Sequence, residues 1–253
     1  MFKRAIVRKP CKNLVKGLTS ADLGLPDFEL AIIQHQEYIN ALQQCGLEVH
    51  ILEADENYPD SVFVEDVALL TDQCAIITNP GAKSRKGEVD EMEKVLSKFY
   101  SNIEKISSPG TVEAGDIMMV GNHFYIGLSD RTNPKGAEQM ISILGKYGLT
   151  GSSVELNEML HLKTGVSYLE NNNMLVAGEF MNHPEFEKFE RIAIPKDEMY
   201  AANSLWINDK VLVPAGNYKV KKMIENAGYE VISLDMSEFR KLDGGLSCLS
   251  LRF

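Results

Sequence analysis

The chain has 253 residues and a formal net charge of −10, which argues against nucleic acid and membrane surfaces as partners, because both favour a basic protein. Its 44% hydrophobic and 25% charged residues are typical of a globular protein with a sizeable core. No apolar run is long enough for a signal peptide or a membrane span. The four cysteines lack CxxC spacing, so we expect reduced thiols and a cytoplasmic location.

The N-terminal part predicts a strand, a long loop and a helix. Ala5 and Val7 alternate as in a short strand, and residues 12–27 show no helical period. A loop of that length is usually functional. Phe28, Ile32, Ile39 and Leu42 then recur at helical spacing, and Gly46 ends the helix. His35 falls on the apolar stripe, where we expect a hydrogen-bonded core histidine. A strand is expected over 47–51.

From residue 64 onward a pattern recurs: a polar or glycine-containing segment, an apolar strand, a polar turn, a second strand, a helix and a third strand. The paired strands are expected at 64–70 with 75–77, 112–120 with 124–126, 161–169 with 174–176, and 205–207 with 211–213. Leu249, Leu251 and Phe253 begin a fifth copy, whose partner would be the first strand. Helices are expected around residues 89–99, 137–144, 186–189 and 220–227.

One such unit cannot bury both of its faces, so the copies must pack around a shared axis. Closing the last strand onto the first would remove exposed sheet edges. No low-complexity linker interrupts the series, and we therefore predict one α+β domain over residues 1–253.

Equivalent positions in such a ring lie near the same end of its axis. The segments that precede the first strands carry carboxylates, an imidazole and a thiol: Glu65, Asp66, Glu113, Asp116, His161, Lys163 and Cys248. A nucleophile, a base and cation-binding groups would thus meet at the centre. Each group alone could be structural, and Cys248 alone would be read as a small buried core residue.

Other chemistries lack their motifs. The sequence has no HxH, HExxH or paired CxxC spacing, no GxSxG elbow, no Walker A loop and no GxGxxG after a strand. We therefore expect neither a metal site nor a cofactor.

Four stretches together resemble the dimethylarginine dimethylaminohydrolases, and their order and spacing match over essentially the whole chain. The stretches are residues 59–68, 124–133, 160–163 and 243–248. The resemblance implies the pentein fold, an α/β propeller of five ββαβ units around a pseudo-five-fold axis. It also implies a hydrolase of carbon–nitrogen bonds in linear amidines that converts Nω-methylated arginine to citrulline and an amine.

The resemblance also implies the site residues. Cys248 would attack the guanidinium carbon, His161 would act as general acid and then general base, and Glu113 would orient His161. Most family members carry Asp at the position of Glu113. The implied substrate contacts are Asp66 and Glu65 for the guanidinium, Arg85 and Arg131 for the α-carboxylate, and Asp60 with backbone groups of Leu18 and Leu242 for the α-amino group. Residues 12–27 match the family's lid.

The triplet His161-Leu162-Lys163 bears on the substrate. Related deiminases and amidinotransferases carry HxD there, and that second carboxylate would demand two N–H donors, which a dimethylated nitrogen cannot offer. A lysine turned away from the site removes this demand, so the triplet favours methylated arginines. A deiminase or ureidohydrolase on the same scaffold, or an inactive binding module, stays open. The expected partner is a small guanidine amino acid, and a homodimer is kept as an open expectation.

Overall fold

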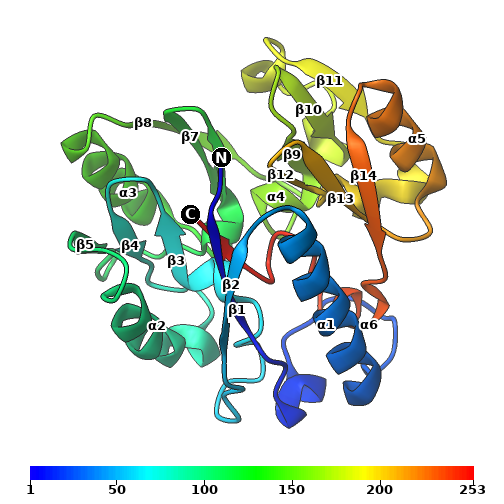
Figure 1. Cartoon of the computed structure of the whole chain (residues 1–253). Coiled ribbons are helices and arrows are strands. Elements are labelled where there is room, and N and C mark those ends of the chain that lie inside the picture. The colour runs from blue at the N-terminus through cyan, green and yellow to red at the C-terminus, as the bar shows by residue number, and fades with distance from the viewer.

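The computed structural model describes all residues 1–253 and consists of five three-stranded sheets placed around a central axis (Figure 1). Their orders are β15-β1-β2, β3-β4-β5, β6-β7-β8, β9-β10-β11 and β12-β13-β14. The strands are β1 (Arg4–Arg8), β2 (Glu48–Leu52), β3 (Ala68–Leu70), β4 (Ala75–Ile77), β5 (Ile103–Lys105), β6 (Ile117–Val120), β7 (His123–Leu128), β8 (Thr150–Glu155), β9 (Val166–Tyr168), β10 (Asn173–Val176), β11 (Glu190–Ala193), β12 (Leu205–Ile207), β13 (Lys210–Pro214), β14 (Glu230–Leu234) and β15 (Leu251–Arg252). In every sheet the middle strand pairs antiparallel on one side and parallel on the other. The predicted fivefold repeat is confirmed.

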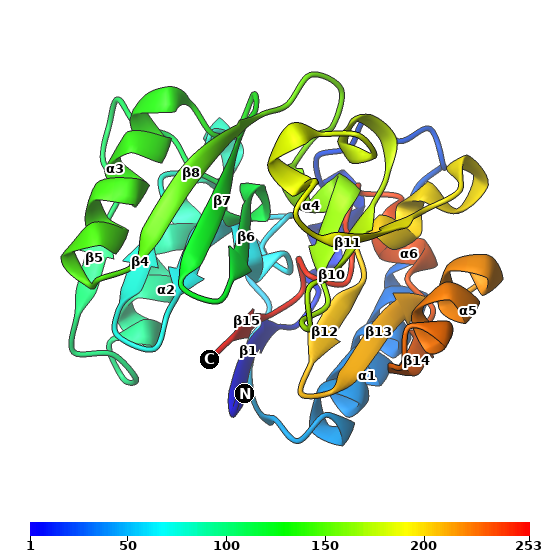
Figure 2. The same ribbon diagram turned by 90° about the horizontal axis from the view of Figure 1, so that it is seen from above.

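The C-terminal strand closes the ring. β15 pairs antiparallel with β1, with Ala5 opposite Arg252 and Ile6 opposite Leu251, and the two chain ends lie near each other in Figure 2. The predicted closure is therefore confirmed. The strand itself is shorter than expected, because Leu249 belongs to the turn before it. Two hydrogen bonds hold the turn: the Ser247 hydroxyl donates to Glu65, and the hydroxyl groups of Ser250 and Tyr38 bond to each other.

The four longer helices are α1 (Phe28–Gln44), α2 (Val89–Leu96), α3 (Pro134–Lys146) and α5 (Tyr218–Asn226). Each connects the last two strands of a unit, as the recurring pattern predicted. The helix expected at 186–189 is only a 3₁₀ turn, η6 (Pro184–Phe186), and α6 (Ser237–Arg240) is one short turn before the C-terminal segment.

Asp27 caps the N-terminus of helix α1, because its side chain accepts a hydrogen bond from the Leu30 amide, and the helix ends before Gly46, which has a φ of +86°. Of its predicted stripe, Ile39 and Leu42 are buried as expected, and the exposed Ile32 is the error. His35 is buried as expected. It was wrongly expected to be hydrogen-bonded, since its Nε2 has no partner. Burial lowers the pKa of His35 to about 4.

Short helical turns precede four of the inner strands. They are η2 (Val64–Val67), η4 (Ala114–Asp116), α4 (Leu162–Gly165) and η7 (Lys196–Ala202), before β3, β6, β9 and β12. The strands predicted from 64, 112 and 161 are therefore too long at their N-terminal ends. Two further 3₁₀ turns are η3 (Lys83–Glu88) and η5 (Gly178–Phe180). Residues 12–27, predicted as a loop, contain one 3₁₀ turn, η1 (Lys12–Lys16).

No helix combines the length and apolar character that crossing a membrane requires. The core is divided among the units rather than gathered at the axis. Helices α2 and α3 each pack apolar residues onto their own sheet, such as Met92 and Leu96 in the first case and Met140 and Leu144 in the second. The centre of the ring is thus left to polar side chains.

Candidate active site

A cavity of about 190 Å³ lies where the helical turns meet. Nine of the ten predicted site residues line it: Leu18, Asp60, Asp66, Arg85, Glu113, Arg131, His161, Leu242 and Cys248. They come from distant parts of the sequence, and the ring brings them together. Glu65 is the one predicted residue that is absent from this lining.

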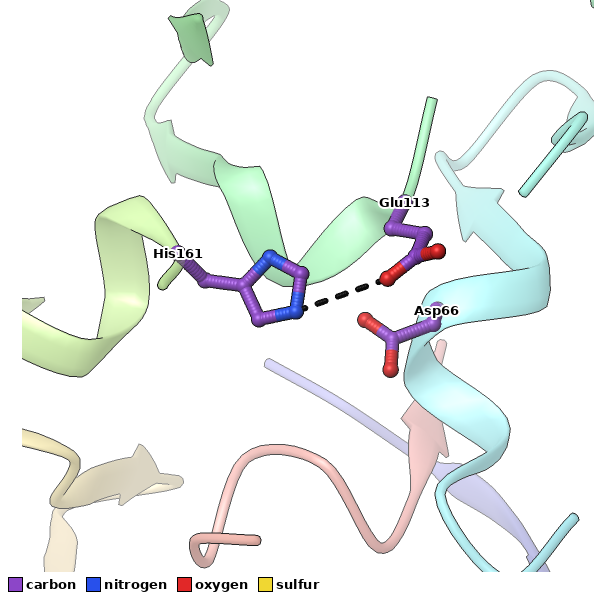
Figure 3. Close-up of side chains that lie close together, drawn as sticks. All are labelled: Asp66, Glu113 and His161. Atoms are coloured by element: carbon purple, nitrogen blue, oxygen red, sulfur yellow. Dashed lines mark ion pairs between the residues drawn. The ribbon is translucent and has the colours of Figure 1, made fainter. Parts of the chain in front are cut away.

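Asp66, Glu113 and His161 form the carboxylate-rich side of the cavity (Figure 3). One oxygen of each carboxylate and one imidazole nitrogen lie within 4.8 Å of one another. The Nε2 atom of His161 is 3.5 Å from Glu113 Oε2. Gly115 lies between Asp66 and His161 and donates its amide to Asp66 Oδ1 at 3.0 Å. A Cβ at Gly115 would crowd both side chains, so only glycine allows this approach.

A third carboxylate, Asp116, contacts the other edge of His161. Its Oδ1 lies 3.3 Å from His161 Nδ1 and accepts the Leu162 amide at 3.1 Å. Its Oδ2 accepts hydroxyl groups of Ser129 and Thr132, both at 2.7 Å. Asp116 is fully buried and thereby fixed. The sequence marked Asp116 as a position before a strand but did not reveal that it contacts His161.

The carboxylates keep His161 charged. Burial alone would lower its pKa, but Asp116, Asp66 and Glu113 outweigh that effect and raise the pKa to about 9. Burial and the neighbouring Asp66 raise the pKa of Glu113. For Asp66, burial is outweighed by Arg85 and His161, which lower its pKa. At neutral pH the cavity therefore holds an imidazolium and ionised carboxylate, which suits a general acid beside a cation site.

Cys248 lies in the turn before β15. Its Sγ accepts the Gly245 amide at 3.4 Å, and its carbonyl accepts the Glu65 amide at 3.1 Å. A Cβ at Gly245 would overlap Asn203, and one at Gly244 would overlap Phe63. The two glycines thus permit the close approach on which the sequence argument depended. Burial, then Glu65 and Asp66, raise the pKa of the thiol to about 12, so these surroundings keep it protonated at neutral pH.

The two arginines differ in their surroundings. Arg85 is buried and donates to the carboxylates of Asp66 and Glu88 and to the carbonyls of Asp60 and Phe63. Arg131 is more open, with 24% of its side chain exposed, and its Nη1 lies 3.8 Å from Glu113 Oε1. Arg131 therefore has fewer existing partners than Arg85 and is the more available donor for the carboxylate of a ligand. Glu88, which fixes Arg85 on its outer side, carried no signal in the sequence beyond its helical spacing.

Residues of the 12–27 segment cover the cavity. The Leu18 amide donates to Asp60 Oδ1 at 2.9 Å, and the Thr19 hydroxyl donates to the Lys241 carbonyl at 2.8 Å. The Ser20 amide donates to Asp243 Oδ2 at 2.6 Å. The segment therefore contacts both Asp60 and the loop that carries Leu242, the residues expected at the α-amino group.

Glu65 lies on the far side of the same turn, and its side chain does not reach the cavity in which its contact with a guanidinium was expected. Its Oε1 pairs with Lys163 at 2.6 Å and Arg252 at 3.0 Å, and its Oε2 accepts the Ser247 hydroxyl at 2.8 Å. These residues line a separate cavity of about 140 Å³. Successive residues of a 3₁₀ turn point in different directions, so Asp66 faces one cavity and Glu65 the other. Lys163 points away from the site, as its place after His161 predicted.

Comparison with known proteins gives consistent results. The family model for eukaryotic N,N dimethylarginine dimethylhydrolase matches residues 27–250. The N(G),N(G)-dimethylarginine dimethylaminohydrolase of Pseudomonas aeruginosa is 57% identical over the full length of both chains. That of Streptomyces coelicolor is 31% identical over 99% of this chain and 96% of its own.

Solved structures agree with these relatives. The Pseudomonas aeruginosa enzyme, as a cysteine-to-serine variant complexed with citrulline, superposes with a TM-score of 0.99 at 56% identity over all of both chains. A histidine-to-glycine variant of dimethylarginine dimethylaminohydrolase, as an adduct with S-methyl-L-thiocitrulline, gives the same values. The N-terminal domain of a cyanobacterial arginine dihydrolase shares the fold at 19% identity, with a TM-score of 0.90 over 100% of this chain and 97% of its own. The fold is the α/β propeller of five ββαβ units, and this chain belongs to the dimethylarginine dimethylaminohydrolase family.

Proposed function

We propose that this chain hydrolyses Nω-methylated arginine, in its monomethyl and asymmetric dimethyl forms, to citrulline and methylamine or dimethylamine. The observation that carries the proposal is the meeting of one thiol, one charged imidazole and two carboxylates in a single cavity of a family member. Residues 1–253 act as one catalytic domain in this proposal. The four free cysteines favour a reducing compartment, the cytoplasm.

The reaction begins when the carboxylates of the cavity bind the cationic guanidinium group of the substrate. Asp66 and Glu113 lie together beside His161, and a guanidinium cation satisfies their acceptors. That cation also lies near Cys248 and offsets the burial that holds the thiol protonated, so the thiol ionises when substrate binds. The thiolate is the reactive nucleophile. Substrate thus creates the nucleophile that attacks it.

The bonds then change in two stages. The Cys248 sulfur bonds to the guanidinium carbon, and the methylated nitrogen leaves with a proton from His161, which gives an S-alkylthiouronium. His161, now neutral, takes a proton from water as the water oxygen attacks the same carbon. The carbon–sulfur bond breaks, and citrulline and the free thiol result. Asp116 holds the Nδ1 edge of the imidazole through both steps, and the Nε2 edge, beside Glu113, gives and takes the proton.

The solved relatives support the two principal roles. One relative binds citrulline after its cysteine is replaced by serine, and the other forms an adduct after its histidine is replaced by glycine. This cavity contains one cysteine and one histidine, Cys248 and His161. The amino-acid end of the substrate would meet Arg131 and Arg85 through its carboxylate, and Asp60, Leu18 and Leu242 through its amino group.

Substrate choice tests the proposal. Asp66 and Glu113 hold unmethylated N–H donors on one flank, while Lys163 points into the opposite cavity and leaves the other flank without a carboxylate. We expect hydrolysis of monomethyl- and asymmetric dimethylarginine, poor turnover of arginine, and none of symmetric dimethylarginine, whose second methyl would collide with Asp66. The measurement is kcat/KM for these four compounds. A preference for arginine would indicate a deiminase instead.

A further inference from the structure

Four polar side chains, one from each of four propeller units, surround the axis beneath the cavity. They are Glu65 in η2, Lys163 in α4, Asn203 after η7, and Ser247 in the turn before β15. Three of them adjoin the reaction centre along the chain: Glu65 precedes Asp66, Ser247 precedes Cys248, and Lys163 follows His161 by two residues. Only Asn203 has no such neighbour.

These four residues are joined in a closed ring of hydrogen bonds. Ser247 Oγ donates to Glu65 Oε2 at 2.8 Å, and Lys163 Nζ pairs with Glu65 Oε1 at 2.6 Å. Asn203 Nδ2 completes the ring, because it donates to Ser247 Oγ at 3.1 Å and to the Lys163 carbonyl at 3.0 Å. A fifth bond, from the Ser247 amide to Asn203 Oδ1 at 2.9 Å, fixes the amide orientation.

Three members of the ring are buried, the Lys163 side chain is 15% exposed, and the four satisfy one another. Asn203 is 7% exposed, Ser247 3% and Glu65 3%. In a site of low dielectric these bonds are strong, and a missing member would leave buried polar groups unpaired. Such a network stabilises one arrangement of its four side chains.

We propose that Asn203 is a positioning residue that sets the placement of Cys248 against His161. Its amide is the one side chain that bonds both the Ser247 backbone, next to the nucleophile, and the Lys163 backbone, in the turn that begins at His161. Asn203 does not line the cavity with Cys248, so it acts on the reaction through these neighbours. Glu65 has the same role from the opposite side of the ring. This inference rests on the proposed function.

The first test separates kcat from KM. Asn203→Leu replaces the side chain by one of similar length and removes its three hydrogen bonds. We expect kcat for asymmetric dimethylarginine to fall about 10- to 100-fold, because a displacement of the reacting groups near 1 Å can cost that much. KM should stay within about twofold of the wild-type value. The control is Asn173→Leu, which removes an amide bond to Tyr229 between two units, outside the cavity. The control should keep wild-type kcat.

The second test is a double-mutant cycle, which also keeps the proposal falsifiable if the leucine variant folds poorly. Ser247→Ala removes two bonds of the ring and leaves the Asn203–Lys163 bond. If the ring acts as a unit, the kcat losses of Asn203→Leu and Ser247→Ala are not multiplicative in the double variant. Should the leucine variant be unstable, Asn203→Asp replaces it in the cycle.

The outcomes are distinct. An unchanged kcat in the Asn203 variants, multiplicative losses in the cycle, or an equal loss in Asn173→Leu overturns the positioning role. If the wild-type chain itself fails to hydrolyse methylated arginine, the proposed function fails, and that result is recognised before any variant is compared. Thermal midpoints of all variants show whether a lost kcat only follows a loss of folded protein.

Discussion

Glu65 and Asp66 are neighbours in the sequence, yet they belong to two different regions. Asp66 faces the cavity of Cys248, where its partners are Arg85 and the Gly115 amide and where His161 lies beside it. Glu65 faces the opposite cavity, where a lysine, an arginine and a serine satisfy both of its oxygens. The first region gathers the carboxylates of Asp66, Glu113 and Asp116 around one imidazole, whereas the second surrounds one carboxylate with two cations.

The two regions have different roles, since the first binds substrate and the second holds the surrounding structure in place. On the cavity side the carboxylates of Asp66, Glu113 and Asp116 surround one imidazole and leave acceptors for a cation. On the Glu65 side the charges are paired at short distances and buried. Substitutions on the first side should therefore change binding and chemistry, and substitutions on the second should change rate and stability without affecting substrate affinity.

The largest effect is expected at the nucleophile. Cys248→Ser should reduce kcat by roughly 10⁴-fold or more, because an alcohol is a far weaker nucleophile at this site. Binding of asymmetric dimethylarginine, measured by calorimetry, should persist because the carboxylates are unchanged. Residual turnover at the wild-type rate would exclude a covalent mechanism through this residue.

Loss of the imidazole should be nearly as severe. His161→Gly should lower turnover roughly 10²- to 10⁴-fold, the usual range for a general acid–base group. With a substrate whose leaving group needs no protonation, the thiouronium should accumulate on Cys248, because water is no longer activated. Mass spectrometry of the intact protein detects that adduct. If no adduct forms while Cys248 remains reactive toward a haloacetamidine, His161 has another role.

Substitutions of the two neighbouring carboxylates, Asp66 and Glu65, should have contrasting effects. Asp66→Asn should lower kcat/KM about tenfold or more, because a hydrogen bond to a charged group contributes about 1.5–3 kcal/mol. The loss should be mainly in KM. Glu65→Gln should leave KM near the wild-type value and lower the thermal midpoint, since it leaves the partly buried Lys163 and Arg252 without their carboxylate. A KM defect in Glu65→Gln would return Glu65 to the substrate site.

The smallest effect concerns pH. In the folded protein the pKa of His161 is raised from 6.5 to about 9, so its ion pairs contribute stability fully below pH 6.5 and lose it as the pH rises toward 9. Asp116→Asn should lower this pKa and weaken the pH dependence of the thermal midpoint over that range. Titration of the His161 ring protons by NMR, assigned with His161→Gly, measures the pKa, and thermal denaturation at several pH values measures the midpoint. If the pH dependence of the thermal midpoint is unchanged in Asp116→Asn, Asp116 is not the dominant partner of His161.

Much of the architecture follows from local pattern. The recurring strand pairs and helices, and the closure of the C-terminal strand onto Ala5 and Ile6, were predicted because alternation and helical spacing are local properties. The glycines before Cys248 likewise marked a close approach of the backbone. Strand starts were wrong where a helical turn intervenes, as at residues 64–67, because one turn of helix gives no periodic signal.

The sequence by itself determined which residue types would meet at the axis, because a fivefold repeat places the segments before its inner strands at one end. Only the tertiary structure decided which way each side chain points. A 3₁₀ turn rotates about 120° per residue, so adjacent carboxylates such as Glu65 and Asp66 must face different surroundings, and the orientation of the whole turn selects which of them faces the cavity. The same holds for Asp116 beside His161 and for Asn203 between Ser247 and Lys163. Their partners are far away in the sequence, and no local periodicity specifies contacts that form only when separate units pack.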